Sequence, residues 1–147
     1  MAIDPNYAQA LSGLALCYYV LAAMGAKPAG EMTQLANAAA EKALTLDPSD
    51  SESHTVLAVM AEIFDYDWNR AEKHHRMSVA VERVSPRARC CYGVQYLLHK
   101  ERATEAIGQS RLALQSDPLS MLFHFGLVWC LYFNGQHGEA IVCARRA

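Results

Sequence analysis

One tripeptide occurs twice in the C-terminal half of the chain. Glu105-Ala106-Ile107 returns as Glu139-Ala140-Ile141, an offset of 139 − 105 = 34 residues. An offset of this size is typical of proteins built from stacked helical repeats rather than from one closed domain. Because a single repeat cannot bury its apolar face alone, the tripeptide predicts several helix pairs that pack in a row.

A dipeptide that ends in proline divides the chain into segments. It occurs as Asp4-Pro5, Asp47-Pro48 and Asp117-Pro118, with Ser85-Pro86 as a variant. An Asp or Ser side chain can accept a hydrogen bond from a helix N-terminus, and proline at the first helical position loses no intrahelical bond. We therefore expect each dipeptide to mark the start of a new helix pair.

The segments around these dipeptides resemble the tetratricopeptide repeat (TPR), a helix-turn-helix unit of about 34 residues that ends near a proline. The matching segments are Ala43–Pro48, Ala113–Pro118, and Leu131–Gly135 followed by Glu139-Ala140-Ile141. The resemblance extends over essentially the whole chain. It implies an all-α fold, a right-handed α-solenoid of stacked antiparallel helix pairs with about four repeats and about eight helices.

The resemblance also implies a division of the chain into repeats. We expect one TPR solenoid segment over residues 1–147, with approximate repeats at 6–48, 49–86, 87–118 and 119–147. The last repeat is truncated, and Ala2-Ile3-Asp4-Pro5 looks like the close of a repeat whose beginning is absent. Natural arrays end in a capping helix with a polar outer face. The chain is therefore expected to be an excised segment of a larger bacterial multi-repeat protein that can self-associate through its uncapped terminal repeats.

Turn and cap signals locate the ends of the helices. Turns inside the repeats are expected at residues 25–31, 65–67, 100–102 and 134–135. Asp67 is expected to cap a helix over about 68–84, in which Trp68 and Ala71 begin the inward face. His75 and Ser78 stand where the TPR family usually has a large apolar residue and an alanine. That helix is therefore expected to be loose or slightly overlong.

Charge and hydropathy exclude some classes of partner. Lys plus Arg total 13 against 15 Asp plus Glu, which gives a formal net charge of -2. A nucleic-acid surface would need a clustered positive field, so this near-balance argues against one. The apolar run Leu11–Met24 has no Lys or Arg before it and is too short to span a bilayer. We expect neither a nucleic acid nor a membrane as partner.

The cysteines and histidines raise the question of catalysis or metal binding. Neighbouring side chains on a helix point about 100° apart, so Cys90-Cys91 and His74-His75 cannot readily share a tetrahedral metal. The sequence contains no Cys-x-x-Cys and no His-Glu-x-x-His. We expect these residues to be packed or solvated, with no cofactor, no metal and no enzymatic activity in this segment. A catalytic role for Cys90, Cys91 or His99 is the third alternative.

An odd number of cysteines without framework spacing favours a reducing, cytoplasmic setting. The five are Cys17, Cys90, Cys91, Cys130 and Cys143.

The TPR resemblance also implies a binding groove. In that family the first helix of each repeat lines a concave surface with its second, fifth, ninth and twelfth or thirteenth positions. Phe125, Trp129 and Tyr132 are spaced by four and three residues, so we expect them to share a helix face. Large aromatic residues are favoured anchors of protein interfaces. The aromatic patch either binds a partner or packs against further repeats. By register the groove consists of Gln9, Ser12, Leu16 and Tyr19; Glu52, Thr55, Val59 and Glu62; Ala88, Cys91, Gln95 and Leu98; and Leu122, Phe125, Trp129 and Tyr132.

These features predict a non-catalytic scaffold for protein–protein interaction that binds a peptide, a helix or a partner domain in the groove. The alternative is an intramolecular sensor or spacer in a multidomain regulator or enzyme, such as a winged-helix regulator, a cyclase, a kinase or a glycosyltransferase. In that case the partner of the segment is its own chain.

Overall fold

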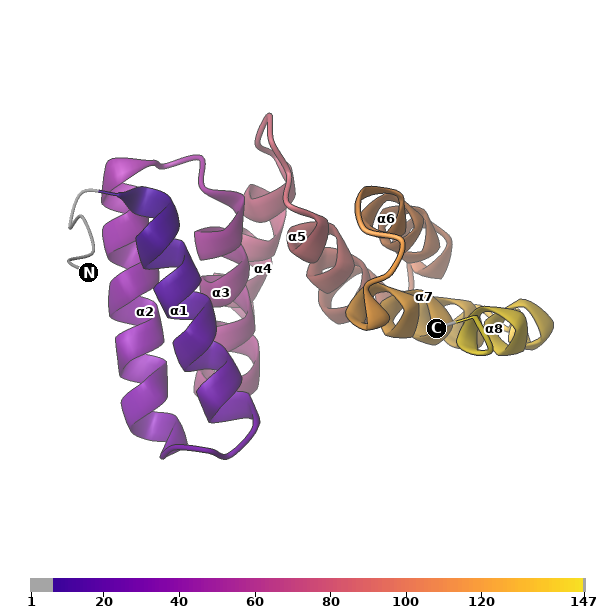
Figure 1. The fold of residues 1–147 in the computed structure, drawn as a ribbon, viewed down its shortest axis with the longest axis horizontal. Coiled ribbons are helices and arrows are strands. Elements are labelled where there is room, and N and C mark those ends of the chain that lie inside the picture. The colour runs from indigo at the N-terminus through magenta and orange to yellow at the C-terminus, as the bar shows by residue number, and fades with distance from the viewer. Residues whose placement is uncertain (1–6, 147) are drawn as a thin grey trace. The chain divides into compact units, whose positions relative to one another are not determined.

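The computed structural model describes residues 7–146, and this part of the chain is helical, with turns and bends but no strand. Its eight α-helices fall into two compact units, Met1–Arg83 and Val84–Ala147. Each unit contains two helix pairs (Figure 1). The all-α fold with eight helices is thus confirmed for the described residues. The expectation about Ala2–Pro5 lies outside them.

Unit 1 contains the pairs α1/α2 and α3/α4. The first pair is α1 (Ala8–Ala23) and α2 (Ala29–Leu46). In the second pair, α3 (Ser51–Met60) continues into a π-helical turn, η1 (Ala61–Asp65), before α4 (Trp68–Val79). Helix α3 packs against α4 and also against both helices of the first pair.

The core of unit 1 lies where α1, α2 and α3 meet. Small residues let these helices approach closely, and larger side chains such as Leu57 and Met60 fill the remaining space. The fully buried residues of this cluster include Ala15, Ala36, Ala40, Leu57 and Met60.

Unit 2 repeats the arrangement with a more irregular first helix. Helix α5 (Pro86–Cys91) runs directly into a π-helical segment, η2 (Tyr92–Leu97), and then a 3₁₀ turn, η3 (Leu98–Lys100). The other helices of the unit are α6 (Ala103–Ser116), α7 (Met121–Phe133) and α8 (His137–Ala144).

Helix α7 provides much of the core of unit 2. It packs against α6 and α8, and also against α5 and η2. Leu131 and Cys130 on α7 are fully buried, as are Leu97 on η2 and Ala106 on α6. Segment η2 and helices α6, α7 and α8 therefore contribute to one apolar core.

The turns inside the helix pairs lie where the sequence predicts them. Tyr66, Glu101 and Gly135 have φ angles of 54°, 58° and 76°, the left-handed conformation that ends a helix. The first turn, between Ala23 and Ala29, contains Gly25 with φ 64°. Glycine adopts this conformation without strain, whereas Tyr66 and Glu101 do so at some cost in free energy.

The expected helix starts at two Asp-Pro dipeptides are wrong. Asp47 and Asp117 instead end α2 and α6, and the next helices begin only at Ser51 and Met121. The Asp47 carboxylate accepts hydrogen bonds from the backbone N–H and the hydroxyl of Ser49. These carboxylates therefore stabilise a turn between helix pairs, since an Asx turn competes with helix capping for the same side chain.

The other N-cap predictions are confirmed. Ser85 caps α5 by accepting a hydrogen bond from the Ala88 N–H, with Pro86 at the first helical position. Asp67 caps α4 by accepting one from the Arg70 N–H at 3.0 Å. Each cap satisfies a backbone donor that has no partner within its helix.

The helix expected over about 68–84 is shorter, because α4 ends at Val79. Trp68 does not begin an inward face, since its side chain is 58% exposed, whereas Ala71 is buried as expected. His75 and Ser78, which replace the apolar residues usual in the TPR family, are both buried. The Ser78 hydroxyl donates to the backbone carbonyl of His75, which satisfies one polar group inside the core.

Candidate functional site

Three aromatic rings form a ladder on the exposed face of α7. Phe125, Trp129 and Phe133 follow one another at intervals of four residues, so their side chains lie on one helix face. The ring centroids of Phe125 and Trp129 are 5.7 Å apart in an edge-to-face contact, and those of Trp129 and Phe133 are 5.3 Å apart. The three side chains are 57%, 41% and 58% exposed. We call these three residues the aromatic ladder.

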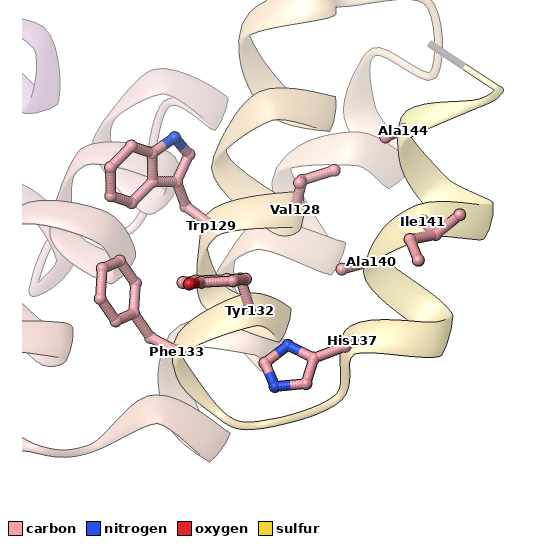
Figure 2. Close-up of a pocket in the computed structure, with 8 residues that line it drawn as sticks. All are labelled: Val128, Trp129, Tyr132, Phe133, His137, Ala140, Ile141 and Ala144. Atoms are coloured by element: carbon pink, nitrogen blue, oxygen red, sulfur yellow. The ribbon is translucent and has the colours of Figure 1, made fainter.

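Tyr132 extends this surface toward α8. Its ring lies 5.4 Å from that of Phe133 and 5.2 Å from that of His137. In Figure 2 the Tyr132 ring lies between the Phe133 and His137 rings. The predicted neighbours Phe125 and Trp129 do contact each other, but the ring that Trp129 stacks on is Phe133 rather than Tyr132. Phe133 was missing from the predicted groove, although a further step of four residues from Trp129 would have found it.

Two pockets flank the aromatic ladder. The first, here the α7–α8 pocket, has a volume of about 520 Å³ and an almost entirely apolar lining (Figure 2). Its lining residues are Val128, Trp129, Tyr132, Phe133, His137, Ala140, Ile141 and Ala144.

The second, here the Gln95 pocket, has a volume of about 540 Å³ and a more polar lining. It lies between η2, η3 and the start of α6 on one side and α7 on the other. Trp129 and Phe133 line both pockets, so the ladder is the ridge between them. The Gln95 pocket is lined by Val94, Gln95, Leu98, His99, Glu101, Ala103, Trp129, Phe133 and Asn134.

Gln95 contributes an unusual polar group to its pocket. Its carboxamide oxygen is inaccessible to solvent, and no residue in the described part of the chain donates a hydrogen bond to it. The backbone carbonyl of the same residue accepts a hydrogen bond from His99 Nδ1. Buried oxygens in proteins are nearly always hydrogen-bonded, so this oxygen becomes an acceptor for an N–H donor in the pocket only if the Gln95 side chain turns toward it.

The remaining predicted groove residues differ in exposure. Leu122 and Gln9 are exposed, and Leu16, Tyr19, Glu52, Cys91 and Leu98 are half-buried. Ser12, Thr55, Val59, Glu62 and Ala88 are buried. In unit 2 the structure brings Gln95, Leu98 and Trp129 together around one pocket. A groove role for the whole set stays a prediction.

A histidine pair connects α3 to α4 in unit 1. His54 Nδ1 lies 3.0 Å from His74 Nδ1, and His54 Nε2 lies 3.1 Å from the backbone carbonyl oxygen of Pro48. Burial, and then the proximity of His54, lowers the pKa of His74 to about 4, and burial also lowers the pKa of His54. Both imidazoles are therefore neutral at pH 7. Sequence reasoning missed this pair because it considered His74 only with its neighbour in the chain.

His75, the adjacent residue, has a different role. Its Nε2 lies 3.1 Å from a carboxylate oxygen of Glu62, and both side chains are buried between η1 and α4. His75 therefore replaces an apolar core residue by a polar one whose hydrogen bond is made inside the unit.

The Cys90 thiol is not set up for nucleophilic chemistry. Cys90 is buried, and burial together with the nearby Cys130 raises the pKa of its thiol to about 11. A thiol with such a pKa is almost wholly protonated at neutral pH and is a poor nucleophile. Within residues 7–146, no group of three or more His, Cys, Asp or Glu side chains could hold a metal ion.

Comparisons with known proteins bear on the fold. No family model matches the sequence, and neither does any curated protein. The structure is similar to a crystal structure of the MamA protein, with a TM-score of 0.62 and 17% sequence identity over 97% of this chain and 72% of that chain. At this identity the likeness shows the fold alone. The chain has a TPR-like helical-repeat fold.

The likeness therefore confirms the fold class expected from the repeat pattern. Among the helices of residues 7–146, none has the length and apolar character needed to cross a membrane.

Proposed function

We propose that this chain is a non-catalytic scaffold for protein–protein interaction and that unit 2 binds a peptide, a helix or a partner domain against α7. The observation that carries the proposal is the aromatic ladder. Phe125, Trp129 and Phe133 are all exposed, and two of them separate two pockets. Soluble proteins seldom leave several stacked aromatic rings in water without a binding role.

The free energy gained by covering the exposed aromatic ladder favours binding at this surface but is too small for tight binding. The exposed fractions of the three ladder side chains correspond to about 300 Å² if each side chain offers about 200 Å². At about 25 cal/mol per Å², covering that area contributes about 8 kcal/mol. Association itself costs about 4–15 kcal/mol, so the ladder alone gives at best weak binding. A specific complex therefore needs polar contacts beside the rings.

The Gln95 pocket supplies such a contact. Once the Gln95 side chain turns its carboxamide oxygen into the pocket, an N–H of the partner can donate to that oxygen while apolar side chains of the partner cover Trp129 and Phe133. A hydrogen bond of this kind contributes about 1 kcal/mol and fixes the register of the bound segment. Residues Gln95, Leu98 and Trp129 were expected in the groove from the TPR resemblance, and this pocket is where we place the partner.

Selection of displayed random peptides on the whole chain tests the proposal. We expect peptides that bind the wild type with micromolar affinity and lose at least tenfold in affinity with Trp129→Ser. Leu119→Ser is the matched control, because Leu119 is an exposed apolar residue of unit 2 that lines neither pocket. Circular dichroism must show native helix content for both variants.

Two further variants distinguish the pockets. Gln95→Ala removes a residue that lines only the Gln95 pocket, and Ile141→Ser changes one that lines only the α7–α8 pocket. We expect Gln95→Ala to weaken peptide binding about fivefold and Ile141→Ser to leave it unchanged. Peptides that bind wild type and Trp129→Ser equally, or no selectable peptide at all, would contradict the proposal and favour a sensor or spacer role within the parent chain.

A further inference from the structure

The imidazoles of His54 and His74 converge from two helices of unit 1. His54 lies on α3 and is 3% exposed, and His74 lies on α4 and is half-buried. The ring centroids are 5.2 Å apart with a tilt of 36°. The two Nδ1 atoms face each other at 3.0 Å. Two ring nitrogens are thus held face to face between the helices, and one of them donates a hydrogen bond to the other.

The hydrogen bond at the other end of His54 fixes its tautomer. The Pro48 carbonyl can only accept, so His54 Nε2 carries the proton and donates it to this oxygen at 3.1 Å. His54 Nδ1 therefore presents a lone pair, and His74 Nδ1–H donates to it in the metal-free protein. A backbone carbonyl bound to the far ring nitrogen is also the usual support of a metal-ligating histidine, because it fixes the orientation of the ring.

The distance between the nitrogens matches a chelate. Two nitrogens at about 2.1 Å from one metal ion lie about 3.0 Å apart when they subtend 90° and about 3.4 Å apart at the tetrahedral angle. The observed 3.0 Å fits two adjacent positions of an octahedral ion. The nitrogens now face each other nearly head-on, so each ring would have to turn by about 35–45° to aim its lone pair at the ion.

We propose that His54 and His74 form a two-histidine binding site for a divalent transition-metal ion such as Ni²⁺ or Zn²⁺. Imidazole is a preferred ligand of both ions, and water fills the remaining positions. On binding, the His74 proton moves from Nδ1 to Nε2, so both rings stay neutral and no proton is released. Asp50 favours the cation, whereas Lys73 and Arg70 oppose it, since all three lie within electrostatic range of the pair.

The ion would link α3 to α4 and, through His54, to the turn at Pro48. The site lies wholly in unit 1 and uses none of the residues assigned to partner binding. Its success or failure is therefore independent of the function proposed for unit 2.

Calorimetric titration of the tag-free chain with Ni²⁺ tests the site. All variants carry Cys17→Ser, because Cys17 is an exposed thiol that could bind metal by itself. We expect one Ni²⁺ per chain with micromolar affinity. Loss of either histidine removes the chelate, so His54→Asn and His74→Asn should each weaken binding at least tenfold. His124→Asn is the matched control and should bind as the parent does, because His124 Nε2 also contacts a proline carbonyl and His124 lines neither pocket of unit 2.

His54 is buried, and its replacement could unfold unit 1, so His74→Asn decides the outcome if His54→Asn loses its helical circular dichroism. A second readout needs no variant. In amide NMR spectra, paramagnetic Ni²⁺ should first broaden signals near His54 and His74, before those near His99. Undiminished affinity in His74→Asn, no binding at 1 mM Ni²⁺, or broadening that begins elsewhere would overturn the proposal.

Discussion

Gly126 on α7 lies against Cys90 on α5, and its replacement by alanine gives a quantitative test of the packing of unit 2. A Cβ atom added at this position would lie 2.6 Å from Cys90 Sγ and 3.3 Å from Val94 Cγ2. The first distance is shorter than real contacts of a Cβ atom, so the buried Cys90 side chain or one of the two helices has to shift. Overpacking of this kind costs about 1–3 kcal/mol.

Two effects partly offset each other in Gly126→Ala. Alanine in a helix interior is favoured over glycine by about 1 kcal/mol. We therefore expect a net destabilisation of about 0–2 kcal/mol. Cys90→Ala alone should destabilise by about 1 kcal/mol, because it leaves a void where the buried sulfur was.

The double variant Cys90→Ala/Gly126→Ala should be more stable than the two single effects predict. With Sγ absent, the new Cβ occupies the void and keeps its helix propensity, so we expect a coupling energy of about 2 kcal/mol. Urea unfolding followed by circular dichroism, with reductant present, measures all four proteins. Single effects that add to within about 0.5 kcal/mol would refute the close approach of α7 to Cys90.

Two more predictions concern the thiols and the helix caps. At pH 8, Ellman's reagent should modify the exposed Cys17 in the native state but Cys90 only after unfolding. Burial raises the pKa of Cys90 to about 11, so almost none of this thiol is ionised at pH 8. Equal rates for the two thiols would contradict the buried environment. Asp67→Ala should lower the free energy of unfolding by about 1 kcal/mol, since it removes the acceptor for the Arg70 N–H, and Asp67→Asn should retain most of it. An unchanged urea midpoint for Asp67→Ala would show that the cap contributes nothing.

Local signals predicted the ends of several helices. The left-handed turns at Tyr66, Glu101 and Gly135 and the caps at Ser85 and Asp67 lie where the sequence indicated. These features depend on a few neighbouring residues, so they can be recognised without knowledge of the fold.

The failures arose where one side chain has two local uses or where the contact is distant in sequence. Asp47 could cap a helix or hold an Asx turn, and only the structure shows the turn. His54 and His74 lie 20 residues apart in the sequence, and no pattern within either helix predicts that they pair. Trp68 looked like a core residue by its type, yet packing left it exposed.

The candidate site could be predicted only in part. A face containing Phe125 and Trp129 follows from helical periodicity, and their ring contact confirms it. The two pockets depend on how η2 and α8 pack beside α7, which periodicity does not specify. The pocket volumes and the burial of the Gln95 oxygen follow only from the three-dimensional packing of unit 2.

The π-helical segments η1 and η2 affect how the chain tolerates insertions. A π turn accommodates one residue more than an α-helix over the same path, usually as a bulge within an otherwise regular helix. Removing one residue from η2 would restore a continuous α-helix and leave the directions of the later side chains nearly unchanged, because the extra residue is taken up within the π turn. Homologous chains could thus differ in length inside these helices, not only in their loops.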